Sequence, residues 1–419
     1  MYDTPEPEGD LRALFEGVRR MSEALARPLS PEDQTLQSME AASPVKWNLA
    51  HTSWFFETFL LKPSLADYAE FHPQFAFLFN SYYQQVGPMH ARARRGMLSR
   101  PTVEEVGAYR AHVDDAMRRL LDRPGQLCGE ATDLIALGCA HEQQHQELLL
   151  TDLKHALFHN PLDPDPYSCA ERNQQAPDLT WIEHAGGVAE IGYEGGGFSF
   201  DNEGPRHQAL LQPFLIASRP ATNGEFLAFI EQGGYRRSDL WLSDGWAEVC
   251  EKGLSHPLYW RKGAEGWSEY TLFGRRPVDP EAPLCHVSFY EACAFAEWSG
   301  ARLPTEFEWE SAFAAEPAAG QFLTNSGPEA PRFVDGGGEP VAVYGTVWEW
   351  TGSPYAPYPG YRAAPGAVGE YNGKFMCNQM VLRGGSCATP EGHIRPTYRN
   401  FFPPDAQWQY SGVRLAKDA

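Results

Sequence analysis

The pattern of apolar and polar positions divides the chain into two parts. In the first ~160 residues, apolar side chains recur about every 3.6 positions over long segments, which is the spacing of amphipathic helices. The segments are LRALFEGVRRMSEAL (11–25), WNLAHTSWFFETFLL (47–61), VEEVGAYRAHVDDAMRRLL (103–121) and residues 133–158. Four or more such segments predict a helical bundle.

The pattern changes after a proline-rich stretch. Pro161, Pro164 and Pro166 fall within six residues, and a helix cannot continue through them. Beyond Thr180, glycine, proline and tryptophan become frequent and short β-like pieces alternate with loops. Helices are expected only near 222–232 and 288–299. We therefore predict a multidomain α and α+β protein, with a helical domain at 1–160, a linker at 161–178 and a second domain at 179–419.

Composition narrows the class of protein. The 419 residues include 42% hydrophobic and 13% aromatic side chains, enough for two globular domains. The net charge of -21 argues against a nucleic-acid partner and against binding to anionic membranes. No stretch approaches the ~20 apolar residues of a membrane span, and the acidic N-terminus lacks an apolar signal core. Eight cysteines without a C-x-x-C pair are expected to be free thiols, so we expect a cytoplasmic protein.

A histidine pair is the main chemical signal. His141 and His145, in the sequence HEQQH, lie four residues apart on one face of a predicted helix. His51 lies about 90 residues earlier in another apolar helix. Two packed helices could present three nitrogens to one ion and leave coordination positions open, as in catalytic metal sites. The spacing does not choose the metal, since zinc hydrolases also use H-E-x-x-H with the glutamate as general base.

Several phrases resemble known families. The second half carries FSFDNEGPRH, ATNGEFLAFIEQGGY, HVSFYEACAFAEWSGARLPTEFEWE, VWEWTGSPY, VLRGGS and SGVRLA. Together they resemble the formylglycine-generating-enzyme/sulfatase-modifying-factor domain, which has a C-type-lectin-like core. The first half, with PVKWNLAHTSWFFE and HEQQHQELLLTDLKHA, resembles a DinB-like four-helix bundle. This order of domains is similar to that of ergothioneine-biosynthesis sulfoxide synthases of the EgtB type.

The resemblance implies a non-haem Fe(II) enzyme that uses O2. Such an enzyme joins a thiol sulfur to imidazole C2 of hercynine, the trimethylated betaine of histidine, and forms a sulfoxide. The thiol donor would be cysteine or γ-glutamylcysteine. Carried over by position, His51, His141 and His145 would be the iron ligands. The cysteine pair of the formylglycine-generating enzymes is not evident at matching positions, so that activity is not implied.

The resemblance also implies substrate contacts, each with a plausible chemistry. Gln144 would contact the hercynine imidazole, because an amide can orient a ring nitrogen. Asn400, Phe401 and Phe402 would receive the betaine, since aromatic faces suit a quaternary ammonium. Arg92 and Arg95 would bind carboxylates of the thiol substrate, for which a guanidinium is well shaped.

Two adjacent tyrosines are the candidates for the catalytic proton donor. Tyr82 and Tyr83 resemble tandem tyrosines near iron in one branch of the family, where a phenol diverts the reaction from thiol oxidation to C–S coupling. In another branch the tyrosine comes from the second domain, so Tyr371 and Tyr398 are the fallback candidates. Asn48 stands where a histidine is expected in relatives.

Three alternatives remain open at the level of sequence. A selenoneine-type synthase would couple hercynine to a selenium donor through a similar site. A zinc-dependent hydrolase or transferase on a DinB scaffold would use Glu142 as its base. A non-catalytic lectin-like module would carry a relic bundle, although an intact histidine set argues against it.

Overall fold

The computed structural model describes residues 7–122, 129–169, 175–334 and 340–419. These residues form two compact units. The helical unit contains the chain up to Pro161 together with two short segments, Gly195–Phe198 and Ala364–Tyr371. The remaining residues form the second unit. A division of the sequence at the proline-rich stretch does not anticipate that two segments from the second half pack with the helices.

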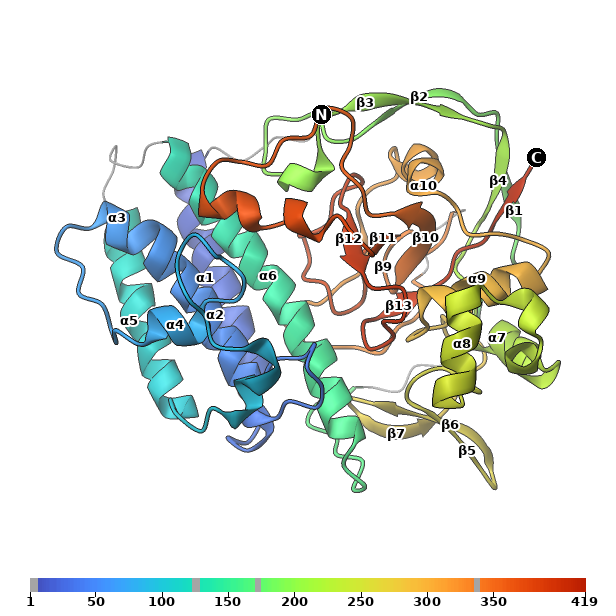
Figure 1. Ribbon diagram of the computed structural model, residues 1–419, viewed down its shortest axis with the longest axis horizontal. Coiled ribbons are helices and arrows are strands. Elements are labelled where there is room, and N and C mark those ends of the chain that lie inside the picture. The colour runs from blue at the N-terminus through green and yellow to red at the C-terminus, as the bar shows by residue number, and fades with distance from the viewer. Residues whose placement is uncertain (1–6, 123–128, 170–174, 335–339) are drawn as a thin grey trace. The chain divides into compact units, whose positions relative to one another are not determined.

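Four long helices form the frame of the helical unit (Figure 1). They are α1 (Pro7–Ala26), α2 (Val45–Phe56), α5 (Val103–Leu121) and α6 (Gly129–Phe158), in the places that the apolar spacing predicts. Helix α6 packs against α1 and α2, and α2 packs against α5. The shorter helical elements are η1 (Asp33–Thr35), η2 (Glu57–Leu61), α3 (Lys62–Ser64), α4 (Phe75–Phe79), η3 (Arg92–Met97) and η7 (Ala367–Glu370).

Local chemistry explains where these helices begin and how closely they pack. Helix α5 starts at a capping box, in which Thr102 Oγ1 accepts from the Glu105 N–H at 3.1 Å and the Glu105 carboxylate accepts from the Thr102 N–H at 2.6 Å. Every residue of α2 is buried, so α2 is the inner helix of the bundle. On α6, a Cβ at Gly138 would lie 2.5 Å from the Phe56 ring. This glycine therefore allows α2 to approach α6 one turn before His141.

The second unit is built from short strands in small sheets. One sheet has the order β12-β11-β10-β13 and another the order β1-β4-β14. The remaining sheets are β5-β6-β7, β2-β3 and β8-β9. The strands are β1 (Trp181–His184), β2 (Gly187–Ile191), β3 (His207–Leu211), β4 (Phe214–Ala217), β5 (Trp260–Gly263), β6 (Gly266–Thr271), β7 (Gly274–Pro277), β8 (Gly320–Gln321), β9 (Tyr344–Gly345), β10 (Trp348–Pro354), β11 (Met380–Arg383), β12 (Asn400–Phe402), β13 (Ser411–Gly412) and β14 (Ala416–Asp418).

Four α-helices accompany these strands in the described residues. Helices α7 (Asn223–Glu231) and α9 (Phe289–Trp298) confirm the two expected helices, whereas α8 (Ser243–Lys252) and α10 (Glu306–Phe313) were not predicted. The short 3-10 elements are η4 (Asp201–Glu203), η5 (Gly234–Arg236), η6 (Ser238–Leu240) and η8 (Gly373–Phe375). Helix α10 does carry a sequence signal, because Thr305 and Glu308 form a capping box at its start.

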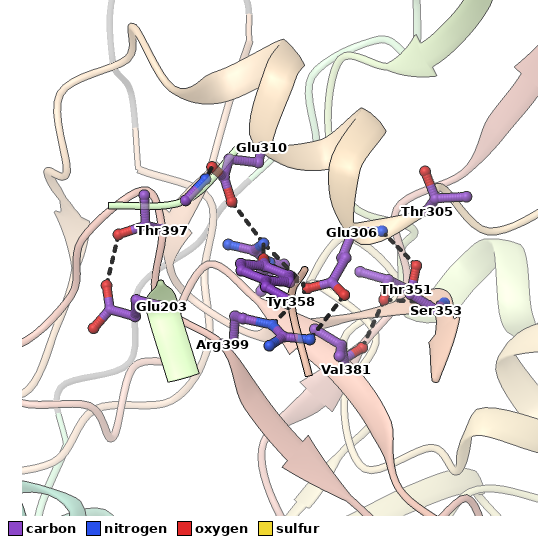
Figure 2. Close-up of polar contacts among 12 residues, drawn as sticks. Glu203, Thr305, Glu306, Glu310, Thr351, Ser353, Tyr358, Val381, Thr397 and Arg399 are labelled. Atoms are coloured by element: carbon purple, nitrogen blue, oxygen red, sulfur yellow. Dashed lines mark hydrogen bonds and ion pairs between the residues drawn. The ribbon is translucent and has the colours of Figure 1, made fainter. Parts of the chain in front are cut away.

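A buried ionic network fixes strand β12 of the second unit (Figure 2). Glu306 of α10 accepts two hydrogen bonds from Arg399, at 2.8 and 3.0 Å. Glu310, one turn later, accepts from Arg383 at 2.7 Å. Two carboxylates thus face two guanidinium groups, and burial is tolerated because each charge is paired. Since Arg399 directly precedes β12, this network holds the strand that carries Asn400, Phe401 and Phe402.

The cysteines of the described residues form no disulfide, as expected. Cys377 is exposed and Cys387 is buried, and neither forms a disulfide. Cys128 lies outside the described residues.

Candidate metal centre

The three histidines of the sequence motif come together in the helical unit. His51 lies on α2, and His141 and His145 lie one turn apart on α6. Their candidate ligand nitrogens all lie within 4.8 Å of one another. The ring centroids are separated by 4.9 Å for His51–His141, 4.8 Å for His51–His145 and 4.6 Å for His141–His145. Three imidazoles converging in this way can bind one metal ion.

Hydrogen bonds orient two of the rings and leave nitrogens available. The Phe79 carbonyl accepts from Nδ1 of His51 at 2.6 Å. The side-chain oxygen of Asn48 accepts from Nδ1 of His145 at 2.8 Å. Because both partners accept, Nδ1 carries the proton in each ring and Nε2 keeps its lone pair. Outer hydrogen bonds of this kind fix the tautomer of metal-binding histidines.

Unpartnered nitrogens support the same interpretation. Nε2 of His51 and both ring nitrogens of His141 have no hydrogen-bond partner within the described residues. These side chains are 0% and 1% exposed, respectively. A buried polar atom without a partner is costly unless something else binds it. A metal ion at the centre of the triad would satisfy Nε2 of His51 and one of the two ring nitrogens of His141, so the residues fit such an ion.

Burial keeps the three rings in the form that binds metals. Desolvation lowers the pKa of His141 to about 3. It also holds the pKa values of His51 and His145 well below the ordinary value, and the neighbouring His141 adds to the effect. The imidazoles are therefore neutral at neutral pH, as metal ligation requires. Three nitrogen ligands leave positions open for substrates.

Glu142 does not serve as the base of a zinc hydrolase. Its carboxylate accepts from Arg19 at 2.9 Å, from Arg110 at 3.0 Å and from Ser22 at 2.7 Å. Burial opposes its ionisation, but the two guanidinium groups outweigh burial and lower the pKa of Glu142 to about 2. A general base near neutral pH needs a much higher pKa and a free path to water. Glu142 instead fastens α6 to α1 and α5.

Gln144 and Tyr371 meet beside the histidines. The Tyr371 hydroxyl donates a short hydrogen bond to the side-chain oxygen of Gln144. The Tyr371 ring lies 5.5 Å from the His141 ring, nearly at right angles to it. Tyr371 ends the segment Ala364–Tyr371, which belongs to the helical unit. One fallback candidate of the sequence analysis thus packs directly against a member of the triad.

The tandem tyrosines occupy two different environments. Tyr83 is fully buried, and its ring packs against Trp54 at 5.5 Å and Phe59 at 5.2 Å. Burial raises its pKa well above the ordinary value. Tyr82 is half-buried, stacks on Tyr83 at 4.6 Å and lies 6.4 Å from the Tyr371 ring. Tyr82 therefore lies beside Tyr371, whereas Tyr83 belongs to the core of the bundle.

Arg95 is a buried cation that forms no ion pair among the described residues, although the charge of Asp152 acts on it. It is 2% exposed, and it donates to Ser43 Oγ at 2.9 Å and Ser81 Oγ at 3.0 Å. Its Nε atom has no hydrogen-bond partner among the described residues, and burial lowers its pKa. Arg92 is exposed and donates to the Ala41 carbonyl. A buried guanidinium whose charge is only partly balanced, here by Asp152, is suited to bind an anionic group.

Trp47 connects Arg95 to the triad. The guanidinium carbon of Arg95 lies 3.3 Å from the centroid of the Trp47 ring. Trp47 also stacks on the His51 ring at 4.7 Å, with an interplanar angle of 15°. Arg95 is therefore one aromatic ring away from a candidate metal ligand. Trp47 and Asn48 precede His51 by four and three residues. In a helix this spacing places both side chains next to His51, so their contact with the triad could have been predicted from the sequence.

The other predicted residues lie in the second unit. Phe401 stacks on Tyr355 at 4.0 Å, and Phe402 packs edge-on against Trp408 at 5.6 Å. Asn400, Phe401 and Phe402 are all half-buried, so their side chains remain partly accessible. Tyr398, the second fallback candidate, is buried and its hydroxyl lies 3.2 Å from Nε2 of His393.

Comparison with known proteins identifies both halves of the chain. The DinB superfamily model matches residues 14–149, and the sulfatase-modifying factor enzyme 1-like domain matches residues 167–335 and 341–419. Hercynine oxygenase of Mycolicibacterium thermoresistibile is 32% identical over 411 residues, covering 90% of this chain and 87% of that protein. Hercynine oxygenase of Mycobacterium tuberculosis is 34% identical over 406 residues, covering 90% and 91%. The chain belongs to the hercynine oxygenase family.

Membership of the hercynine oxygenase family confirms the predicted fold class and the enzyme class. The chain is an oxygenase-type enzyme with a DinB-like bundle and a sulfatase-modifying-factor domain. Oxygenase chemistry fits a catalytic metal that uses O2 at the histidine triad. The zinc-hydrolase and lectin-module alternatives are not favoured.

The second domain also has relatives outside the hercynine oxygenase family. Formylglycine-generating enzyme of Streptomyces coelicolor is 30% identical over 309 residues, covering 61% of this chain and 96% of that protein. In the described part of the chain, no helix is both long enough and apolar enough to cross a membrane.

Proposed function

We propose that this protein is an Fe(II)-dependent sulfoxide synthase of ergothioneine biosynthesis. It would join the sulfur of cysteine or γ-glutamylcysteine to imidazole C2 of hercynine. The C2–H and S–H bonds break and a C–S bond forms. One oxygen atom of O2 is retained on sulfur and the other leaves as water. The observation that carries the proposal is the triad of neutral histidines, two of them fully buried, in a chain of the hercynine oxygenase family.

His51, His141 and His145 would hold the iron. Bound iron would supply a site at which O2 is bound and reduced. The protein's part is to keep the three imidazoles neutral, oriented and dry. Phe79 and Asn48 orient two of the rings through their Nδ1 atoms, and burial disfavours the doubly protonated, cationic form of all three.

Tyr371 is the tyrosine that the geometry favours as proton donor. Its hydroxyl hydrogen is directed to Gln144 and its ring contacts His141. A phenol is protonated at neutral pH and can supply a proton where charge develops. Tyr82 remains a candidate because its ring lies beside Tyr371. Tyr83 remains the weaker member of the pair because it is enclosed in the core.

Separate groups would bind the two organic substrates. Arg95 would bind a carboxylate of the thiol substrate, supported by its burial without an ion pair among the described residues, and Arg92 would add an exposed positive charge. Asn400, Phe401 and Phe402 would contact the trimethylammonium group of hercynine, supported by their half-buried aromatic faces. Gln144 would contact the hercynine imidazole.

No observation favours the selenium donor of the alternative synthase, and the names of the relatives do not favour it either. We also propose a cytoplasmic location, which the free thiols fit.

The test is an aerobic incubation of Fe(II)-loaded protein with hercynine and each candidate donor, followed by product mass. We expect a sulfoxide conjugate with cysteine or γ-glutamylcysteine. The variant His145→Ala should lose both iron and product. His159→Ala is the matched control, because His159 is an exposed histidine just beyond the end of α6. Full iron content and turnover in His145→Ala would refute the assignment of the triad.

A further inference from the structure

Glu370 joins two segments that are far apart in the sequence. Its Oε2 accepts from the backbone N–H of Gln84 at 2.7 Å, and its Oε1 accepts from the backbone N–H of Gln85 at 3.1 Å. Each carboxylate oxygen therefore binds one of two consecutive backbone donors. These bonds are charge-assisted and are stronger than those of a neutral acceptor. The donors lie directly after the Tyr82–Tyr83 pair.

The residue after Glu370 is held at a second point. Tyr371 donates to Gln144 on α6, so adjacent residues fasten the segment to two different parts of the helical unit. The backbone just before these two residues is tightly turned. Gly366 adopts φ 77°, and a Cβ at Gly369 would lie 1.8 Å from the Ala364 carbonyl oxygen. Only glycine fits at such a close approach, so the backbone leading to Tyr371 has little freedom once Glu370 is bound.

We propose that Glu370 is a positioning residue that holds the Tyr371 hydroxyl at Gln144. Through Tyr371 it would set how much of the reaction ends in C–S coupling and how much in simple thiol oxidation. The same contact links the Tyr82–Tyr83 segment to Tyr371, so the position of each candidate proton donor depends on that of the others. The effect on products rests on the proposed function, whereas the effect on the position of Tyr371 does not.

The chemistry of the acceptor makes the proposal specific. A carboxylate offers two oxygens that both accept. A glutamine offers one accepting oxygen and an amino group that donates, so it can replace only one of the two bonds. Glu370→Gln should therefore give an effect between those of the wild type and Glu370→Ala. Glu391→Ala is the matched control, because Glu391 is an exposed glutamate whose backbone N–H, which the substitution keeps, donates to the Leu323 carbonyl at 3.0 Å.

Two measurements test the contact without any catalysis. Hydrogen exchange at Gln84 and Gln85 should be about fivefold faster in Glu370→Ala, which is the effect of losing a hydrogen bond worth ~1 kcal/mol. Nitration of Tyr371 by tetranitromethane, read by peptide mass, should increase from the wild type to Glu370→Gln to Glu370→Ala. Glu391→Ala should match the wild type in both. Unchanged exchange and unchanged nitration in Glu370→Ala would overturn the proposal.

The product ratio then tests the role of the contact in the reaction. With iron content and thermal midpoint close to those of the wild type, Glu370→Ala should raise the ratio of thiol sulfinic acid to sulfoxide about fivefold, with Glu370→Gln between. An unchanged ratio in a variant whose Tyr371 has become reactive would overturn the positioning role. If the wild type forms no sulfoxide with any donor, the proposed function fails, and exchange and nitration still decide whether Glu370 holds Tyr371.

Discussion

Nδ1 of His145 donates a hydrogen bond of 2.8 Å to the side-chain oxygen of Asn48. Asn48 is 2% exposed and its amide nitrogen points to the Ser43 and Pro44 carbonyls at 3.4 and 3.3 Å. The amide oxygen therefore faces His145 and cannot easily rotate away. This neutral acceptor sets the tautomer of His145 without adding charge beside the histidine triad.

Asn48→Ala should weaken metal binding about 10- to 100-fold, the usual effect of removing a partner of a ligating histidine. The loss arises because the His145 ring is no longer held with Nε2 toward the centre. Competition with a chromophoric chelator measures the affinity. Asn48→Asp keeps an accepting oxygen and should retain most of the affinity. Equal affinity in Asn48→Ala and the wild type would show that His145 is oriented by other groups.

Tyr371→Phe should lower the rate of sulfoxide formation about 100-fold or more, the range for a lost proton donor. Sulfinic acid from the thiol should increase while iron remains bound, because the hydroxyl touches Gln144 and not a histidine nitrogen. Product analysis by mass gives both quantities. The comparison variants are Tyr82→Phe, Tyr83→Phe and Tyr398→Phe. If Tyr371→Phe kept the wild-type ratio of sulfinic acid to sulfoxide and Tyr82→Phe changed it, the proton donor would be Tyr82 rather than Tyr371.

Arg95→Gln should raise KM for the thiol substrate about 10- to 100-fold, which corresponds to a lost hydrogen bond to a charged group. KM for hercynine should change little. The reason is that Arg95 is the buried guanidinium that stacks on Trp47, and no carboxylate of the described residues pairs with it. Steady-state kinetics with each substrate varied in turn makes the measurement. Arg94→Gln, an exposed neighbour, is the control. Equal KM values in the two variants would contradict the assignment.

Glu306→Ala should destabilise the second unit by about 3–5 kcal/mol, because it leaves Arg399 buried without its carboxylate. Both partners are almost fully enclosed, with side-chain exposures of 4% for Glu306 and 0% for Arg399. Guanidinium unfolding followed by tryptophan fluorescence measures the free energy. The exposed pair Arg237–Asp239 provides the control variant Asp239→Ala, which should unfold like the wild type. If Glu306→Ala lowered the free energy of unfolding no more than Asp239→Ala, the buried ion pairs would not be needed for the stability of the second unit.

Local rules predict the helices well where capping and spacing agree. Helix α5 begins and ends at the expected residues, since the Thr102–Glu105 capping box precedes a strong apolar repeat. Helix α10 was missed although Thr305 and Glu308 carry the same signal. It spans only eight residues, and it lies in a region whose glycine- and proline-rich sequence predicts loops.

The spacing of residues along helices also allowed the histidine triad to be predicted from the sequence. His141 and His145 share a helix face by local geometry, and His51 lies on the neighbouring apolar helix. Contacts across the sequence could not be predicted in this way. Gln144 and Tyr371 are 227 residues apart, and Arg19 and Glu142 are 123 residues apart. The periodicity of apolar residues along a helix does not indicate which distant side chains come into contact. The partner of Gln144 and the ion pairs of Glu142 could therefore be found only from the three-dimensional structure.

The most direct test of the central claim is a single-turnover reaction under isotopically labelled O2. Fe(II)-loaded protein, hercynine and cysteine or γ-glutamylcysteine should give a C–S coupled product that carries one labelled oxygen atom on sulfur. Protein without metal, and the His145→Ala variant, should give none. A coupled product whose oxygen comes from water, or equal product from metal-free protein, would contradict an oxygenase reaction at the histidine triad.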